Sequence, residues 1–112
     1  DNFIVTIDFN KIQSLAPVQE TIALEPLDEK WRAFGWHVIR VDGHDHEALH
    51  RAYEEARGAM GGGKPVVVIA DTVKGKGIRE VEETMGNHSM TVAADVCDKW
   101  LAGLRGELAG LE

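Results

Sequence analysis

Three short, almost uniformly apolar runs constrain the fold of this chain more than any other feature. They span residues 2–9, 36–41 and 65–70. Apolar and β-branched residues follow one another in them without alternation, which is typical of parallel strands covered on both faces. Segments with helical patterns separate the runs. The order strand, loop, helix, strand, helix, strand, loop, helix therefore predicts an α/β fold with a parallel sheet and flanking helices.

The first run has a further implication, because the sequence opens inside it. A continuous apolar run suits a central strand with neighbours on both sides, and nothing precedes Asp1 to supply one of them. We therefore expect these 112 residues to be one piece of a domain that is completed by an upstream segment.

Three helices are expected to connect and cover the strands. Asp28 can cap a short helix over residues 29–34, and Gly35 can end it in a left-handed conformation. A second helix is predicted from Asp45 to about Met60, with small apolar residues along one stripe. A terminal amphipathic helix is predicted over residues 92–111.

Composition and charge exclude several classes of function. The net charge of -7 and the absence of a basic stripe argue against a nucleic-acid surface. The apolar runs are too short to span a membrane. A single cysteine, Cys97, cannot form an intrachain disulfide, and no leader pattern is seen, so the cytoplasm is the expected compartment. The helical period places Cys97 on an alanine-rich face, which predicts a buried, inert thiol.

Two long segments follow the first and third strands, at residues 10–27 and 71–91. The first contains Pro17 and Pro26, and neither segment keeps a helical or strand period. Ligands of parallel α/β sheets bind at the carboxyl ends of the strands. Both segments would emerge at that same edge, which is therefore the candidate binding site.

Residues in these loops suggest chemistry, but each has an ordinary alternative. The side-chain oxygen of Asn10 suits a hard cation such as Mg²⁺, yet asparagine at a strand end is also a common turn former. Residues 72–77 contain two lysines and two glycines, which suit a phosphate or diphosphate and equally suit a flexible solvated turn. The spacing of a nucleotide-binding P-loop is absent.

Histidines form a second group of candidates. His44, His46 and His50 are close in sequence, but only the last two share a helix face and no cysteine accompanies them. A solvated helix start is therefore favoured over a metal site. His88 lies in a polar loop and is harder to explain by packing.

Several linked motifs resemble those of one family, the transketolases. They are Asn10-Lys11-Ile12-Gln13 after the first strand, Val41-Asp42-Gly43-His44-Asp45 after the second, and Thr72-Val73-Lys74-Gly75-Lys76-Gly77 after the third. The resemblance covers nearly the whole chain and is closest to the amino-terminal half of transketolases that are encoded as two subunits. It implies that residues 1–112 form the carboxy-terminal portion of the thiamine-diphosphate-binding domain.

The resemblance also implies roles for individual residues. Asn10 would bind Mg²⁺, or another divalent cation such as Ca²⁺ or Mn²⁺, through its side chain, and Ile12 would bind it through its main-chain carbonyl. The metal would bridge the diphosphate of thiamine diphosphate, which Lys74 would neutralise. His88 would face the diphosphate and the donor sugar. The implied reaction transfers a two-carbon ketol unit from a ketose or ketose phosphate to an aldose.

Other parts of such a site would lie on other segments. In the family a Gly-Asp-Gly motif, whose aspartate is the remaining protein ligand of Mg²⁺, precedes the part represented here. The glutamate that activates the aminopyrimidine belongs to a pyrimidine-binding domain. We therefore expect a hetero-oligomer with an upstream segment and a pyrimidine-domain subunit, two copies of each, active only when assembled. Around His88 the chain departs from the family, which more often has an aromatic residue before this histidine and a glycine after it.

Other functions are compatible with these residues. A related thiamine enzyme, such as a deoxyxylulose-phosphate synthase or a dehydrogenase E1 component, differs mostly in residues that this chain lacks. A noncatalytic assembly subunit would keep the fold without the chemistry, and the joint presence of Asn10, Lys74 and His88 argues against it. A nucleotide-binding regulatory domain would need a phosphate loop that is not found.

Overall fold

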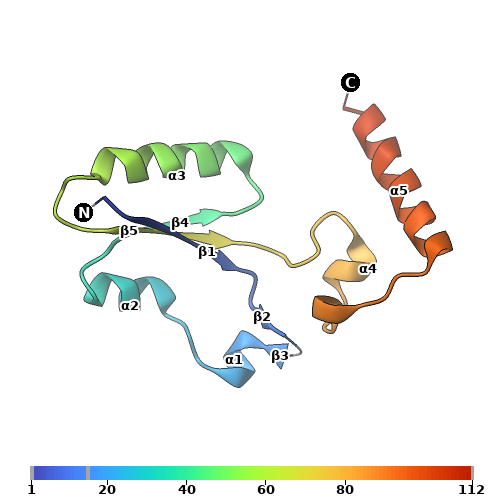
Figure 1. Ribbon diagram of the computed structural model, residues 1–112, viewed down its shortest axis with the longest axis horizontal. Coiled ribbons are helices and arrows are strands. Elements are labelled where there is room, and N and C mark those ends of the chain that lie inside the picture. The colour runs from blue at the N-terminus through green and yellow to red at the C-terminus, as the bar shows by residue number, and fades with distance from the viewer. Residues whose placement is uncertain (1, 15, 112) are drawn as a thin grey trace.

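The chain forms an α/β layer with a three-stranded parallel sheet, as predicted (Figure 1). The computed structural model describes residues 2–14 and 16–111. Along the chain the elements are β1 (Ile4–Phe9), β2 (Ile12–Gln13), β3 (Ala16–Pro17), α1 (Val18–Thr21), α2 (Leu27–Ala33), β4 (His37–Asp42), α3 (His46–Ala59), β5 (Val66–Asp71), α4 (Arg79–Glu82), the 3-10 helix η1 (Asn87–Ser89) and α5 (Ala94–Ala109).

The three apolar runs form the sheet in the order β1-β5-β4, and all neighbours are parallel. The first strand was expected to be central in a sheet that an upstream segment completes; within the described residues β1 pairs on one side only, with β5. β5 is the central strand, and Val66 to Ile69 have no exposed surface. β1 is at an edge, where Thr6 and Asp8 are exposed and only Phe9 is buried.

Helices on the two faces of the sheet make two cores (Figure 1). On one face, Ala52 and Ala56 of α3 pack against Ile39, Val66 and Val68, so the predicted alanine stripe is buried. On the other face the core is formed by Phe9, Leu27, Val67 and Ile69, with Trp31 of α2 and Trp36 packed against it.

Helix ends follow the sequence in part. Asp45 caps α3, because its carboxylate accepts a hydrogen bond from the N–H of Ala48 at 2.9 Å. Gly35 has a φ of +85°, as expected of a residue that ends a helix. The expected cap at Asp28 is wrong: α2 begins at Leu27, and the carboxylate of Asp28 pairs with Arg32 one turn later.

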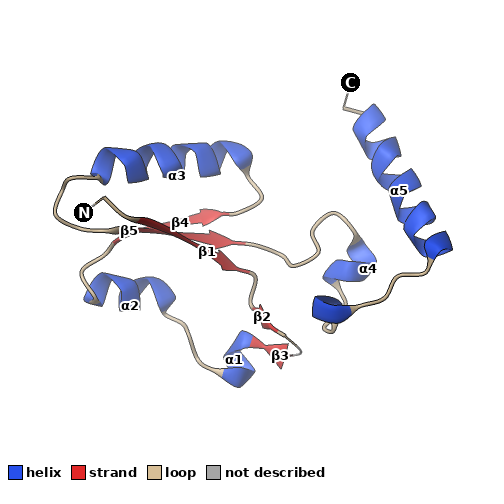
Figure 2. Ribbon diagram, viewed as in Figure 1, coloured by secondary structure: helices blue, strands red, loops and turns tan. Residues whose placement is uncertain are grey.

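The two long loops contain more regular structure than predicted (Figure 2). Residues 10–27 include the small antiparallel pair of β2 and β3 and the single turn α1. Pro17 is compatible with the pairing of β2 and β3, although it has no N–H to donate. The carbonyl of Ile12, which lies opposite, does not need a hydrogen bond from Pro17 in this short ladder. The second loop contains α4 and η1. The short length of these elements left no period in the sequence to detect.

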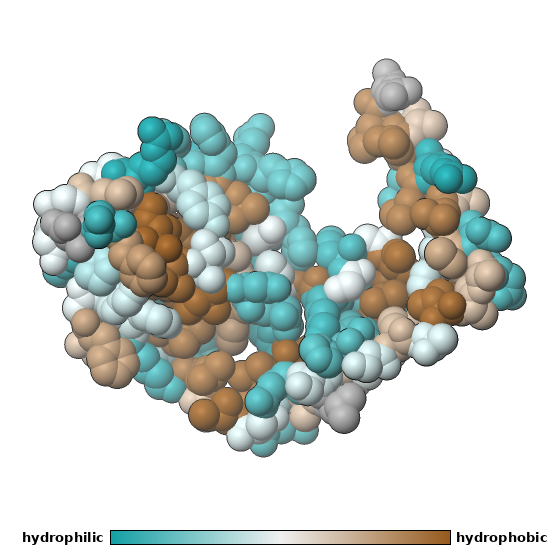
Figure 3. Space-filling model, in the orientation of Figure 1, coloured by the Kyte–Doolittle hydropathy of each residue, from teal (hydrophilic) through white to brown (hydrophobic). Residues whose placement is uncertain are grey.

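The helix α5 stands apart from the α/β layer and exposes apolar side chains (Figures 1 and 3). Val96, Leu101, Leu104 and Leu108 are all exposed. Cys97 is exposed as well, so the prediction of a buried thiol is wrong. The predicted helix forms, but the described part of the chain leaves the side chain of Cys97 exposed on it. In the same described ranges, no helix combines the length and the apolar character needed to cross a membrane.

Candidate binding site at the carboxyl edge of the sheet

The two loops that carry the candidate residues leave neighbouring strands at the same edge of the sheet, as predicted. Phe9 at the end of β1 is paired with Asp71 at the end of β5. The N–H of Thr72 still donates to the carbonyl of Phe9 at 3.3 Å, beyond the last paired residue. The Thr72 hydroxyl also bonds to the carboxylate of Asp8. The starts of both loops are thus held against each other.

Asn10 and Ile12 lie together in a tight loop. The side-chain oxygen of Asn10 accepts a hydrogen bond from the N–H of Ile12 at 3.0 Å. Lys11 between them has a φ of +63°, a conformation that is costly for a residue with a side chain. Its carbonyl accepts from the N–H of Val18 at 2.9 Å. These bonds define the shape of the loop.

The donor set of this loop fits a hard divalent cation. The oxygen of Asn10 has a second lone pair beyond the bond to Ile12. Just outside the β2–β3 ladder the N–H of Val18 donates to the carbonyl of Lys11, a bond that flanks Ile12 and Pro17 and makes them a pair of the non-bonded type. The carbonyl of Ile12 therefore faces away from β3. An amide oxygen and a main-chain carbonyl are ligands that Mg²⁺ and Ca²⁺ accept.

A network of charges fixes the base of this loop, and sequence reasoning missed it. Lys11 Nζ is 2.9 Å from Asp71, and Arg40 donates to both oxygens of Asp71 at 2.7 and 3.0 Å. Arg40 also donates to Glu25 at 2.7 Å. The bonds from Arg40 lower the pKa of Asp71 to about 2 and lower the pKa of Glu25. Asp71 is therefore ionised at neutral pH and remains available to hold Lys11.

Lys74 and His88, fourteen positions apart, are in contact. Lys74 Nζ is 3.1 Å from Nδ1 of His88. An ammonium group has only donors, so Nδ1 accepts and neutral His88 carries its proton on Nε2. Asn87 supports the pair, since its side-chain nitrogen donates to the carbonyls of Lys74 at 3.4 Å and Val81 at 2.9 Å. The pair presents N–H donors and one positive charge, which suits an anion.

The structure thus brings the predicted residues together as two pairs on adjacent loops. No hydrogen bond joins the two pairs within residues 2–14 and 16–111. The ion pair of Lys11 with Asp71 joins the starts of the two loops. A hollow of about 460 Å³ lies beside the first loop, and neither Lys74 nor His88 lines it. Its lining comes mainly from the end of β1 and the first loop, among them Phe9, Lys11, Ile12 and Leu24, and the second loop contributes Met85. Its mostly apolar wall beside polar loop atoms is typical of an organic ligand site.

The other histidines do not form a metal cluster. Among the described residues no group of three or more histidine, cysteine, aspartate or glutamate side chains could hold an ion. His37 is 3.0 Å from Glu55. His44 was predicted to face solvent at the start of a helix. Instead, its Nε2 accepts a hydrogen bond from the N–H of Val73 at 2.8 Å. No local sequence pattern predicts this contact, because the two residues are 29 positions apart.

The turn at Gly43 packs closely against the start of the second loop. A Cβ atom at this position would lie 2.4 Å from Cγ2 of Thr72 and 3.1 Å from the carbonyl oxygen of Asp71. Gly43→Ala is therefore expected to destabilise the protein by about 1–3 kcal/mol, as overpacking does. Thermal unfolding of the protein in its native assembly measures this.

Gly58→Ala is the matched control for that prediction. Gly58 is in α3, and a Cβ there meets no atom within 4 Å. Because alanine is a better helix former, this change should stabilise the protein by up to about 1 kcal/mol. Equal melting temperatures for the two variants would contradict the close approach at Gly43.

Comparison with known proteins identifies the family of the chain. Residues 1–103 match the family described as transketolase, thiamine diphosphate binding domain. The chain is 39% identical over 107 residues to the 6-deoxy-6-sulfo-D-fructose transketolase subunit SqwG of Clostridium sp. (strain MSTE9), covering 96% of this chain and 38% of the relative. It is 34% identical over 107 residues to an apulose-4-phosphate transketolase subunit of Actinobacillus succinogenes, with the same coverage of 96% and 38%.

A longer relative extends the comparison. The chain is 30% identical over 99 residues to the transketolase of Homo sapiens, which covers 88% of this chain and 15% of that protein. The chain therefore spans well under half the length of the curated relatives it matches. The α/β fold, the loop pairs at the carboxyl edge and the match over residues 1–103 lead to one conclusion: the chain belongs to the transketolase family, within its thiamine-diphosphate-binding domain.

Proposed function

We propose that this chain is part of a transketolase that depends on thiamine diphosphate and Mg²⁺, and that its carboxyl edge binds the diphosphate end of the cofactor. One observation supports this proposal most directly. Asn10 and Ile12 lie on one loop of that edge, and Lys74 and His88 lie on the adjacent loop. The first pair offers oxygens to a cation, and the second offers donors to an anion. A metal diphosphate needs both.

The residues of this chain would bind and orient the cofactor, and thiamine diphosphate supplies the electron sink for carbon–carbon bond cleavage when bound. Asn10 and Ile12 would hold the cation against the diphosphate, and Lys74 would neutralise the remaining negative charge. His88, with its Nδ1 bonded to Lys74, would present its Nε2–H to the diphosphate or to an oxygen of the donor sugar. The reaction would move a two-carbon ketol unit from a ketose or ketose phosphate to an aldose.

The site would be completed by other segments. We propose that residues 1–112 are the carboxy-terminal portion of the cofactor domain, and that an upstream segment with a Gly-Asp-Gly motif adds the remaining Mg²⁺ ligand. A pyrimidine-domain subunit would add the glutamate that activates the aminopyrimidine. The complex would be a hetero-oligomer with two copies of each component. The names of the relatives support a divided enzyme, since two of them are called transketolase subunits. The exposed apolar face of α5 supports it too.

Lys74→Ala is expected to weaken the binding of thiamine diphosphate by the assembled complex. Loss of a charge-assisted contact costs about 1–3 kcal/mol, which corresponds to a rise in Kd of about 5- to 150-fold. Isothermal titration calorimetry with thiamine diphosphate in the presence of Mg²⁺ measures this Kd.

Lys64→Ala provides the control. Lys64 is exposed and lies just before β5, at the opposite edge of the sheet. This change removes the same charge without touching the proposed site, so the Kd should stay within about twofold, because exposed charges interact weakly. A comparable loss in both variants would show that general charge, and not Lys74, attracts the cofactor.

A further inference from the structure

His44 takes the place of a strand residue beside the second loop. In the parallel ladder Asp42 is paired with Asp71, and the N–H of Gly43 donates to the carbonyl of Asp71 at 2.7 Å. Donors along β5 alternate between its two neighbours, so the N–H of Thr72 points to β1 and that of Val73 to the β4 side. β4 has ended there, and Nε2 of His44 accepts this N–H at 2.8 Å.

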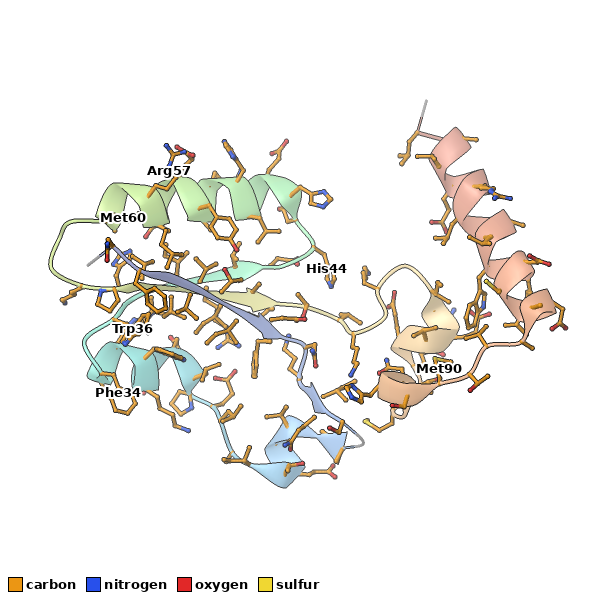
Figure 4. The ribbon with its side chains drawn as sticks, viewed as in Figure 1. Phe34, Trp36, His44, Arg57, Met60 and Met90 are labelled. Carbon is orange, nitrogen blue, oxygen red and sulfur yellow. The ribbon has the colours of Figure 1, made fainter. Side chains whose placement is uncertain are left out.

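His44 lies on the turn between β4 and α3 (Figure 4), and its backbone is itself held in place. Its N–H donates to the carboxylate of Asp42 at 2.9 Å. The next residue, Asp45, caps α3. The turn therefore connects the end of a strand to the start of a helix in one fixed arrangement. A side chain on such a turn is well suited to fix the position of a second loop.

The bond from Val73 sets the path of the chain into Lys74. On its far side Lys74 is followed by Gly75, whose φ is +80° and where a Cβ would lie 2.4 Å from Cγ1 of Val81. The carbonyl of Lys74 also accepts from Asn87 at 3.4 Å. Lys74 is thus held between His44 on one side and Gly75 with Asn87 on the other. The lysine reaches His88 from this fixed backbone.

We propose that His44 is a positioning residue for Lys74, acting through the N–H of Val73 and without contact to the cofactor. The proposal rests on the role of Lys74 proposed above. Its neutral tautomer, with the proton on Nδ1, keeps Nε2 free to accept. Without this acceptor the N–H of Val73 has no partner at the edge of the sheet, and Lys74 is no longer directed towards His88 and the diphosphate.

The proposal predicts that His44→Ala weakens the binding of thiamine diphosphate with Mg²⁺ by about 3- to 10-fold in Kd, the factor that corresponds to one neutral hydrogen bond. His44→Gln should restore binding to within about twofold, because its amide oxygen can occupy the position of Nε2. His50→Ala, at an exposed position on α3, should leave Kd unchanged. Calorimetry on the assembled complex provides these values.

A double-mutant cycle shows whether His44 acts through Lys74. In a Lys74→Ala background, His44→Ala should change Kd by less than about twofold, since the group that it positions is gone. Fully additive effects would overturn the proposal, as would failure of glutamine to restore binding. If Lys74→Ala alone leaves Kd unchanged, the proposed role of Lys74 fails instead, and the inference fails with it.

Hydrogen–deuterium exchange gives a readout that needs no cofactor. The peptide containing Val73 should exchange faster in His44→Ala than in the wild type or in His44→Gln, because the N–H loses its acceptor. Unchanged exchange in His44→Ala would overturn the inference while leaving the proposed role of Lys74 untouched.

Discussion

Asn10→Ala is expected to abolish Mg²⁺-dependent binding of thiamine diphosphate by the assembled complex. The change removes the side-chain oxygen proposed as a metal ligand, and it also removes the acceptor for the N–H of Ile12. That bond helps to hold Lys11 at its positive φ, so the loop that presents the carbonyl of Ile12 should lose its shape as well. Both proposed ligands are lost through one substitution. We expect at least a hundredfold rise in Kd, on the order of 3 kcal/mol or more.

Two further variants separate metal binding from folding. Asn10→Asp keeps an oxygen at the same position and should retain metal-dependent binding, whereas Asn2→Ala, at an exposed position, should change nothing. Titration of Mg²⁺ and thiamine diphosphate by calorimetry gives the affinities, and thermal unfolding shows whether the complex is intact. Unchanged affinity in a folded Asn10→Ala complex would remove Asn10 from the metal site.

The 112 residues alone are expected to be poorly folded and inactive. Their radius of gyration is 17.5 Å, whereas a compact chain of this length has about 13 Å. Leu101, Leu104 and Leu108 of α5 are exposed, and each would contribute about 1.5–3 kcal/mol if it were buried. Phe3 beside the edge strand β1 is 58% exposed. The buried surface is confined to the thin layer around β5.

Coexpression provides the test of this expectation. The chain alone should bind a hydrophobic dye, unfold without a cooperative transition in urea and show no measurable affinity for thiamine diphosphate. Coexpression with a Gly-Asp-Gly segment and a pyrimidine-domain subunit should restore solubility, cooperative unfolding and ketol transfer together. A monomer that unfolds cooperatively and binds the cofactor tightly by itself would show that the site is complete without other segments.

The sequence by itself determined the layer and the edge that carries the candidate site. Uninterrupted apolar runs identify parallel strands locally, and the parallel direction brings both long loops to one edge whatever the order of the strands. Asn10 and Lys74 became candidates because they lie in the loops that follow these runs, and the family resemblance implied their roles. The contact of Lys74 with His88 was not predicted, because two residues fourteen positions apart in an irregular loop carry no local signal that they meet.

Only the tertiary structure decided which distant residues meet. Strand order places β5 between β1 and β4, and this order brings Arg40 to Asp71, 31 positions away, and His44 to Val73, 29 positions away. Charged and polar residues at such separations carry no periodic signal, so neither contact could be predicted. The exposure of Cys97 has the same reason. A helical period defines one face of α5, but it does not show whether another element covers that face. Such cover depends on packing between elements, which local sequence does not encode.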